Sequence, residues 1–130
     1  MLIQNVLSYE DFSNYLDKYK YIIVNISASW CKPCMQIKPD MEKFISVIDE
    51  SECVYLKLDN DIYDQEQEFN SFFNIKKIPY FGFIKDGVLI ESIASGDFIV
   101  VSKKLHELLT TAKNKDNIEF SSNFKIEDEF

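Results

Sequence analysis

The feature that most constrains this chain is a pair of cysteines, Cys31 and Cys34, in the segment SASWCKPC. An almost unbroken run of apolar residues precedes them, YIIVNIS over Tyr21–Ser27, as expected for a central strand buried on both faces. Apolar residues then recur at helical spacing from Met35 to Ile48. The pair therefore falls where a strand ends and a helix begins, and the chain around it is predicted to fold as strand, turn and helix.

Strand and helix patterns alternate along the rest of the chain. The further strands expected are Ile3–Leu7 at a sheet edge, Cys53–Asp59, and two apolar runs flanking Lys85-Asp86-Gly87. Asp-Gly is a strong hairpin signal. The further helices expected are one after the capping pair Ser8 and Asp11, one over Asp64–Phe73, and one over Ser102–Thr111. The order β-α-β-α-β-α-β-β-α predicts an α/β fold with a central mixed β-sheet and helices on both faces.

Length and composition indicate one globular domain with a polar tail. The 130 residues are 46% apolar, which is enough for a single core, and we expect this domain to cover residues 1–112. Residues 113–130 are expected to be an acidic C-terminal extension, because the last fifteen residues hold five acids and one lysine. This extension is expected either to be disordered or to lay Phe120, Phe124 and Ile126 along the domain.

Net charge and the lengths of the apolar runs limit the kinds of partner and the cellular compartment expected for this protein. The net charge of −8 argues against binding to nucleic acid or to anionic membranes. No apolar run is long enough to span a bilayer, and the N-terminus lacks the pattern of a secretory signal. We therefore expect a cytoplasmic protein, in which three cysteines do not describe a disulfide framework. A C-x-x-C pair beside a βαβ pattern then indicates a redox pair.

The position of the pair predicts different roles for its two sulfurs. Cys31 lies where free backbone N–H groups and the positive end of a helix favour an anion, so its thiolate is expected to be the nucleophile. Lys32 adds a positive charge, and Pro33 fits the first helical turn and stiffens the loop. Cys34 is expected to be more buried and to resolve the mixed disulfide between Cys31 and a substrate.

A zinc site is the alternative use of these cysteines. Zn²⁺ would need two more ligands, and the nitrogen or sulfur candidates elsewhere in the chain are Cys53 and His106. Cys53 opens an apolar strand, where a small core residue is expected, and there is no second C-x-x-C. The redox pair is the favoured interpretation, and no metal is expected.

With these residues assembled, the chain resembles the thioredoxin family over about Tyr9 to Leu109. SASWCKPC is similar to the family's Trp-Cys-Gly-Pro-Cys signature, with Lys32 in the glycine position. IPYF resembles the family's Ile-Pro-Thr segment, which implies a cis bond between Ile78 and Pro79 beside the cysteines. Gly96 matches the glycine beside the family's substrate groove.

The resemblance implies a thioredoxin fold and a thiol–disulfide oxidoreductase. Such a protein reduces protein disulfides while its own pair, here Cys31 and Cys34, cycles between dithiol and disulfide. The family usually takes its electrons from an NADPH-dependent thioredoxin reductase, and the redox-active disulfide is the only cofactor implied. A monomer is expected. Two alternatives stay open: an isomerase or oxidant with a less reducing pair, and a thioredoxin-fold binding module with little turnover.

Several residues near the pair are expected to tune its redox chemistry. Many family members carry a buried Asp where this chain has Asn25, and an amide cannot act as a general base for Cys34. Lys57 matches the lysine that usually neighbours this Asp, and it is expected to lack that partner here. The other residues expected to tune the pair are Lys32, Pro33 and Pro79.

The substrate face is expected to include Trp30, Ile78 and Gly96. Trp30 precedes the nucleophile, and packing at the helix start is the alternative role for it. Pro79 is expected to close the groove, with an ordinary strand-start role as the alternative. Tyr80 stands where the family has threonine, which alters this face.

Overall fold

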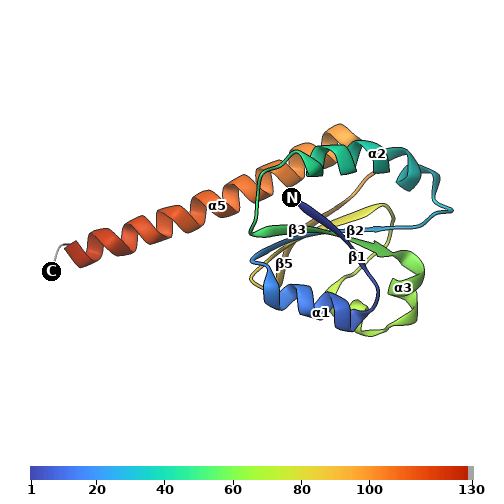
Figure 1. The fold of residues 1–130 in the computed structure, drawn as a ribbon, viewed down its shortest axis with the longest axis horizontal. Helices are drawn as coiled ribbons and strands as arrows, with labels where there is room; N and C mark the ends of the chain where they lie inside the picture. The colour runs from blue at the N-terminus through green and yellow to red at the C-terminus, as the bar shows by residue number, and fades with distance from the viewer. Residues whose placement is uncertain (129–130) are drawn as a thin grey trace.

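The computed structural model describes the backbone of residues 1–128 and the side chains of residues 1–116 (Figure 1). Its centre is a five-stranded sheet in the order β1-β3-β2-β4-β5. The strands are β1 (Leu2–Val6), β2 (Tyr21–Ser27), β3 (Cys53–Asp59), β4 (Tyr80–Lys85) and β5 (Val88–Ala94). β1, β3 and β2 run parallel, while β4 and β5 are antiparallel to their neighbours. The sheet is therefore mixed, as predicted.

The strand predictions agree closely with the structure. β2 and β3 have the predicted bounds, and β1 lies at a sheet edge one residue earlier than expected. Asp86 and Gly87 link β4 to β5 with φ values of 50° and 78°. A two-residue type I′ turn requires positive φ at both positions, which glycine adopts freely and aspartate tolerates. The Asp-Gly hairpin is confirmed.

The helices differ from the predictions at two places. They are α1 (Tyr9–Lys18), α2 (Lys32–Ser46), α3 (Asn60–Gln65), α4 (Glu68–Phe72) and α5 (Phe98–Asp128). The single helix predicted over 64–73 is wrong, because Asp59 caps the chain earlier, accepting from the Asp61 N–H at 2.8 Å, and extended backbone at Glu66 interrupts it. α5 starts before Ser102, since Asp97 Oδ1 accepts from the Ile99 N–H at 3.0 Å.

Helices cover both faces of the sheet, with α1 and α3 on one side and α2 and α5 on the other (Figure 1). The first side is rich in aromatic residues, where Phe12 lies within 6 Å, centroid to centroid, of the rings of Phe69 and Phe73. On the second side Met41 and Leu105 pack against strand residues. Burial of these two apolar layers is the main stabilising contribution to the fold.

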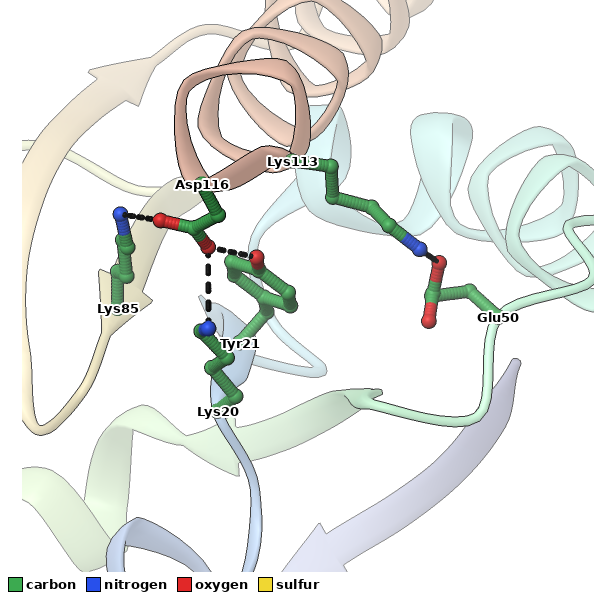
Figure 2. Close-up of polar contacts among 6 residues, drawn as sticks. All are labelled: Lys20, Tyr21, Glu50, Lys85, Lys113 and Asp116. Atoms are coloured by element: carbon green, nitrogen blue, oxygen red, sulfur yellow. Dashed lines mark hydrogen bonds and ion pairs between the residues drawn. The ribbon is translucent and has the colours of Figure 1, made fainter. Parts of the chain in front are cut away.

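The last helix is held at the end of the sheet that lies farthest from Cys31, where β2 begins and β4 ends (Figure 2). Asp116 of α5 accepts hydrogen bonds from the Tyr21 hydroxyl at 2.5 Å and from Lys85 Nζ at 2.6 Å. Lys20 Nζ lies 3.1 Å from the same carboxylate. These three donors hold the pKa of Asp116 well below its ordinary value, the bond from Lys85 being the largest cause.

A second contact joins α5 to the loop before β3. Lys113 forms an ion pair with Glu50, which Figure 2 shows beside the Asp116 cluster. The helix runs without a break across the boundary predicted at residue 112. The division into residues 1–112 and 113–130 stays a prediction, and the side chains of Phe120, Phe124 and Ile126 lie outside the described residues.

Candidate active site

Cys31 and Cys34 form a disulfide at the start of α2, with their Cα atoms 5.3 Å apart. Cys31 is the N-cap residue of this helix, and its Sγ accepts from the Cys34 N–H at 3.3 Å. The exposed fraction is 7% for Cys31 and 1% for Cys34. Cys34 is therefore the more buried of the two, as predicted, and Cys31 is the sulfur that a partner can reach.

The segment before β4 lies directly against this pair. The Ile78–Pro79 peptide bond is cis, as the resemblance implies. The Ile78 carbonyl oxygen lies 4.0 Å from Cys31 Sγ, and the Ile78 side chain packs against the buried cluster that Ala28, Cys31 and Cys34 form. A backbone carbonyl is thus placed beside the reactive sulfur, where an extended chain that approaches Cys31 can bond to it.

Gly96 lies against Pro33, between the two cysteines, and Trp30 directly precedes the pair. A Cβ atom at Gly96 would lie 3.0 Å from Pro33 Cβ, so the backbone of the loop after β5 approaches the start of α2 more closely than a larger residue permits. The Trp30 side chain is 68% exposed, so packing at the helix start does not account for it. The structure thus places Ile78 against Cys31 and Gly96 against Pro33, while Trp30 is an exposed residue directly before Cys31.

Asn25 and Lys57 face each other in the register of β2 and β3. Asn25 Nδ2 donates to the Tyr80 carbonyl oxygen at 3.4 Å, which links β2 to the segment that carries Pro79. Lys57 does not have the family's Asp partner, since position 25 is Asn, and Lys57 Nζ pairs instead with Glu42 of α2 at 2.9 Å. Glu42 is fifteen residues from Lys57, and no local pattern signals a contact that only the packing of α2 on β3 creates.

A cavity of about 360 Å³ opens at the carboxyl ends of the three parallel strands. Asn25, Ser27 and Lys57 line it, together with Met35, the residue after Cys34. The loop after β2 leads to one face of the sheet and the loop after β3 to the other, which is where α/β folds leave a crevice. Solvent therefore reaches Asn25 in a cavity that is also lined by Met35, the residue after Cys34.

Of the two residues considered as further zinc ligands, His106 is an exposed residue of α5 and Cys53 lies in the core. Cys53 pairs with Tyr21 at the start of β2, a full strand of about 20 Å from the cysteine pair. Burial raises the pKa of the Cys53 thiol to about 12, so this residue is a core residue rather than a metal-binding thiolate. Among the described side chains, no three His, Cys, Asp or Glu residues gather where they could hold a metal ion.

No described helix has the length and apolar character that crossing a bilayer requires.

A disulfide at the start of a helix, on a mixed sheet of this topology and beside a cis-proline segment, defines a thiol–disulfide oxidoreductase. The thioredoxin family model matches residues 4–116. Thioredoxin-2 of Pyricularia oryzae is 28% identical over 75% of this chain and 54% of that protein. Thioredoxin of Ictalurus punctatus is 30% identical over 68% of this chain and 79% of that protein.

The crystal structure of Malassezia sympodialis thioredoxin superposes with a TM-score of 0.67 and 27% identity, covering 85% of this chain and 93% of that one. The chain belongs to the thioredoxin family. Its Cys31–Cys34 pair and its relatives show that it is a dithiol–disulfide oxidoreductase of the protein-disulfide reductase type.

Proposed function

We propose that this protein works as a reductant of protein disulfides, with Cys31 as nucleophile and Cys34 as resolving thiol. The observation that carries this assignment is the asymmetry of the pair: Cys31 caps the fifteen-residue helix α2, and Cys34 is buried one turn further. Once reduced, Cys31 faces the free N–H groups and the positive dipole end of that helix, which favour a thiolate.

The cycle balances with two electrons and two sulfur–sulfur exchanges. The Cys31 thiolate attacks one sulfur of the substrate disulfide, forms a mixed disulfide and releases the other sulfur as a thiolate. Cys34 then loses its proton and attacks Cys31 Sγ, which expels the second substrate sulfur and leaves the Cys31–Cys34 disulfide. The substrate is reduced and the protein is oxidised. An NADPH-dependent thioredoxin reductase is the proposed donor that returns the dithiol.

The residues near Cys31 and Cys34 are proposed to bind the substrate or to tune the redox pair. Trp30, Ile78 and Gly96 are proposed to bind the substrate chain: the Ile78 carbonyl lies beside Cys31 Sγ, Gly96 lies against Pro33, and Trp30 is exposed next to Cys31. The residues proposed to tune the redox pair are Asn25, Lys32, Pro33, Lys57 and Pro79. The contact of Pro33 with Gly96 supports this role for Pro33. The hydrogen bond from Asn25 to the Tyr80 carbonyl supports it for Asn25.

The proposal extends to the working form of the protein. We place it in the cytoplasm as a monomer with no bound metal or organic cofactor, acting through its own disulfide. Its redox domain is proposed to cover residues 1–112, with 113–130 as an acidic extension.

A second candidate function is that of an oxidant or isomerase. Asn25 favours this function because it gives Cys34 no carboxylate base. Lys32, between the two cysteines, favours it because its positive charge stabilises the thiolate of the reduced pair. The redox potential of the Cys31–Cys34 couple separates the two functions. A potential near the cytosolic thiol pool supports the reductant, and a much less negative one supports the oxidant.

Trapping the mixed disulfide tests the assigned roles. With Cys34→Ser, a protein substrate should stay covalently bound to Cys31 and be released by dithiothreitol. With Cys31→Ser, reduction of insulin by dithiothreitol should lose its catalysed phase. Alkylation of the reduced protein at neutral pH should label Cys31 first, and faster labelling of Cys34 would contradict the assignment.

A further inference from the structure

Three lysines border the substrate side of the redox pair. Lys32 follows Cys31 directly, and Lys76 and Lys77 come just before Ile78, whose carbonyl oxygen lies 4.0 Å from Cys31 Sγ. All three lysines are exposed. The chain as a whole carries a net charge of −8, so this cationic rim is a local exception.

These three lysines have no carboxylate partner among the described side chains, whereas five other lysines, Lys20, Lys57, Lys85, Lys104 and Lys113, do. Carboxylates close to the site in the chain lie at helix starts. Asp97, next to Gly96, accepts from backbone N–H groups at the start of α5, with the closest at 3.0 Å. On the other side of β2, Asp59 caps α3 and Asp61 lies in its first turn. Among the described side chains the three ammonium groups are therefore unpaired and exposed, so an acidic ligand can reach them.

The side on which the lysines lie is the side a substrate approaches. Ile78 leads into β4, which neighbours β2 on the side opposite to β3. Lys76 and Lys77 therefore lie just before the carbonyl beside Cys31, while Asp59 and Asp61 follow β3 on the other side of β2. We propose that the rim of Lys32, Lys76 and Lys77 selects disulfides flanked by acidic residues. This inference rests on the proposed reductase function and names its substrate class.

The rim and the net charge of the protein act in opposite directions over different distances. At about 0.15 M salt the Debye length is about 8 Å, so a bound peptide is influenced by the rim and little by distant acids. At about 0.01 M salt it is about 30 Å, and the charge of the whole chain then opposes an acidic peptide. The preference should therefore peak near physiological salt and vanish at about 1 M, where the Debye length is about 3 Å.

Three disulfide peptides with the same core and with Glu, Gln or Lys flanks test the proposal. The protein is used in catalytic amount with dithiothreitol as electron donor, and kcat/KM is measured above the uncatalysed rate. Each exposed ion pair changes binding by about 1.5- to fivefold, so we expect the Glu peptide to be reduced roughly fivefold faster than the Lys peptide at about 0.15 M salt. Equal rates, or a preference that persists at about 1 M salt, would overturn the proposal.

Matched variants separate the rim from the net charge. Lys76→Glu with Lys77→Glu should reverse the preference in favour of the Lys peptide. Lys18→Glu with Lys115→Glu also lowers the net charge by four, on exposed residues of α1 and α5, and should keep it. An equal change in both variants would assign the effect to net charge and overturn the proposal. The Gln peptide reports the reductase itself: if wild type does not reduce it, the proposed function fails and this inference with it.

Discussion

Replacing Asn25 by aspartate should destabilise the fold as the pH rises while speeding the resolving step. Asn25 Nδ2 donates to the Tyr80 carbonyl oxygen at 3.4 Å. An ionised carboxylate cannot donate, and it would set a negative oxygen against that carbonyl. The protonated acid can donate in the same position, so Asn25→Asp should be tolerated at low pH and costly at high pH.

The size of the expected loss of folding stability in Asn25→Asp follows from two contributions. Loss of a neutral hydrogen bond costs about 0.5–1.5 kcal/mol, and the long 3.4 Å contact places this one at the lower end. Partial burial in a central strand raises the pKa of the new carboxyl group, and each unit adds about 1.4 kcal/mol. Lys57 offsets part of this cost, although Glu42 already holds it at 2.9 Å. We expect a net loss of about 1–2 kcal/mol at pH 8.

The sign of the pH dependence follows from the raised pKa. A carboxyl group whose folded pKa exceeds its unfolded value of about 3.9 stays neutral more readily when folded. Its destabilisation is therefore absent below about pH 4 and grows as the pH rises through the folded value. Thermal unfolding should show a melting temperature for Asn25→Asp within a degree of wild type near pH 4 and lower by about 3–8 °C at pH 8.

The same carboxyl group should serve Cys34. Asn25 lines the cavity that also reaches Met35, the neighbour of Cys34, so a base at position 25 can exchange a proton with the resolving thiol directly or through one water. Single-turnover reduction of a disulfide substrate should show release from the mixed disulfide about tenfold faster in Asn25→Asp near neutral pH.

Two further variants make this test decisive. Asn14→Asp places the same charge change on an exposed position of α1 and should alter neither readout. Glu42→Gln frees Lys57 to pair with the new carboxylate, so the double variant should recover part of the lost stability. A melting temperature that falls equally at pH 4 and pH 8 would refute the raised pKa of the new carboxyl group. An unchanged resolving rate would show that water or another group already serves as the base.

Three other predictions concern residues that hold the scaffold. Asp116→Asn should lower the free energy of unfolding near pH 7, because the depressed pKa of Asp116 stabilises the folded state. Denaturant titrations should show the difference between wild type and variant shrinking as the pH falls below about 4, and a difference that stays constant with pH would contradict this. Gly96→Ala should cost about 1–3 kcal/mol and slow disulfide reduction, since its Cβ would lie 3.0 Å from Pro33 Cβ; normal kinetics would show that the loop moves aside. Phe12→Ala should cost about 3–5 kcal/mol in urea unfolding while the reduced protein keeps its alkylation pattern, because Phe12 is fully buried far from the redox pair.

Local patterns in the sequence determined most of the fold and the identity of the redox pair. β2 and β3 were predictable to the residue because a continuous apolar run describes a strand buried on both faces. The hairpin was predictable because Asp86 and Gly87 accept positive φ. Cys31 and Cys34 were predictable as a pair because their spacing and place at a helix start carry the chemistry.

Contacts between distant segments were decided only by the tertiary structure. Glu42 meets Lys57, and Asp116 meets Lys20, Tyr21 and Lys85, through the packing of α2 and α5 against the sheet. Side-chain pairing across such separations depends on helix rotation and strand register, which hydrophobic periodicity defines only to within a face. The same limit applies at Cys31. The sequence predicts a thiol at a helix start, but the carbonyl of Ile78 lies beside that thiol only because β4 pairs with β2 in one particular register.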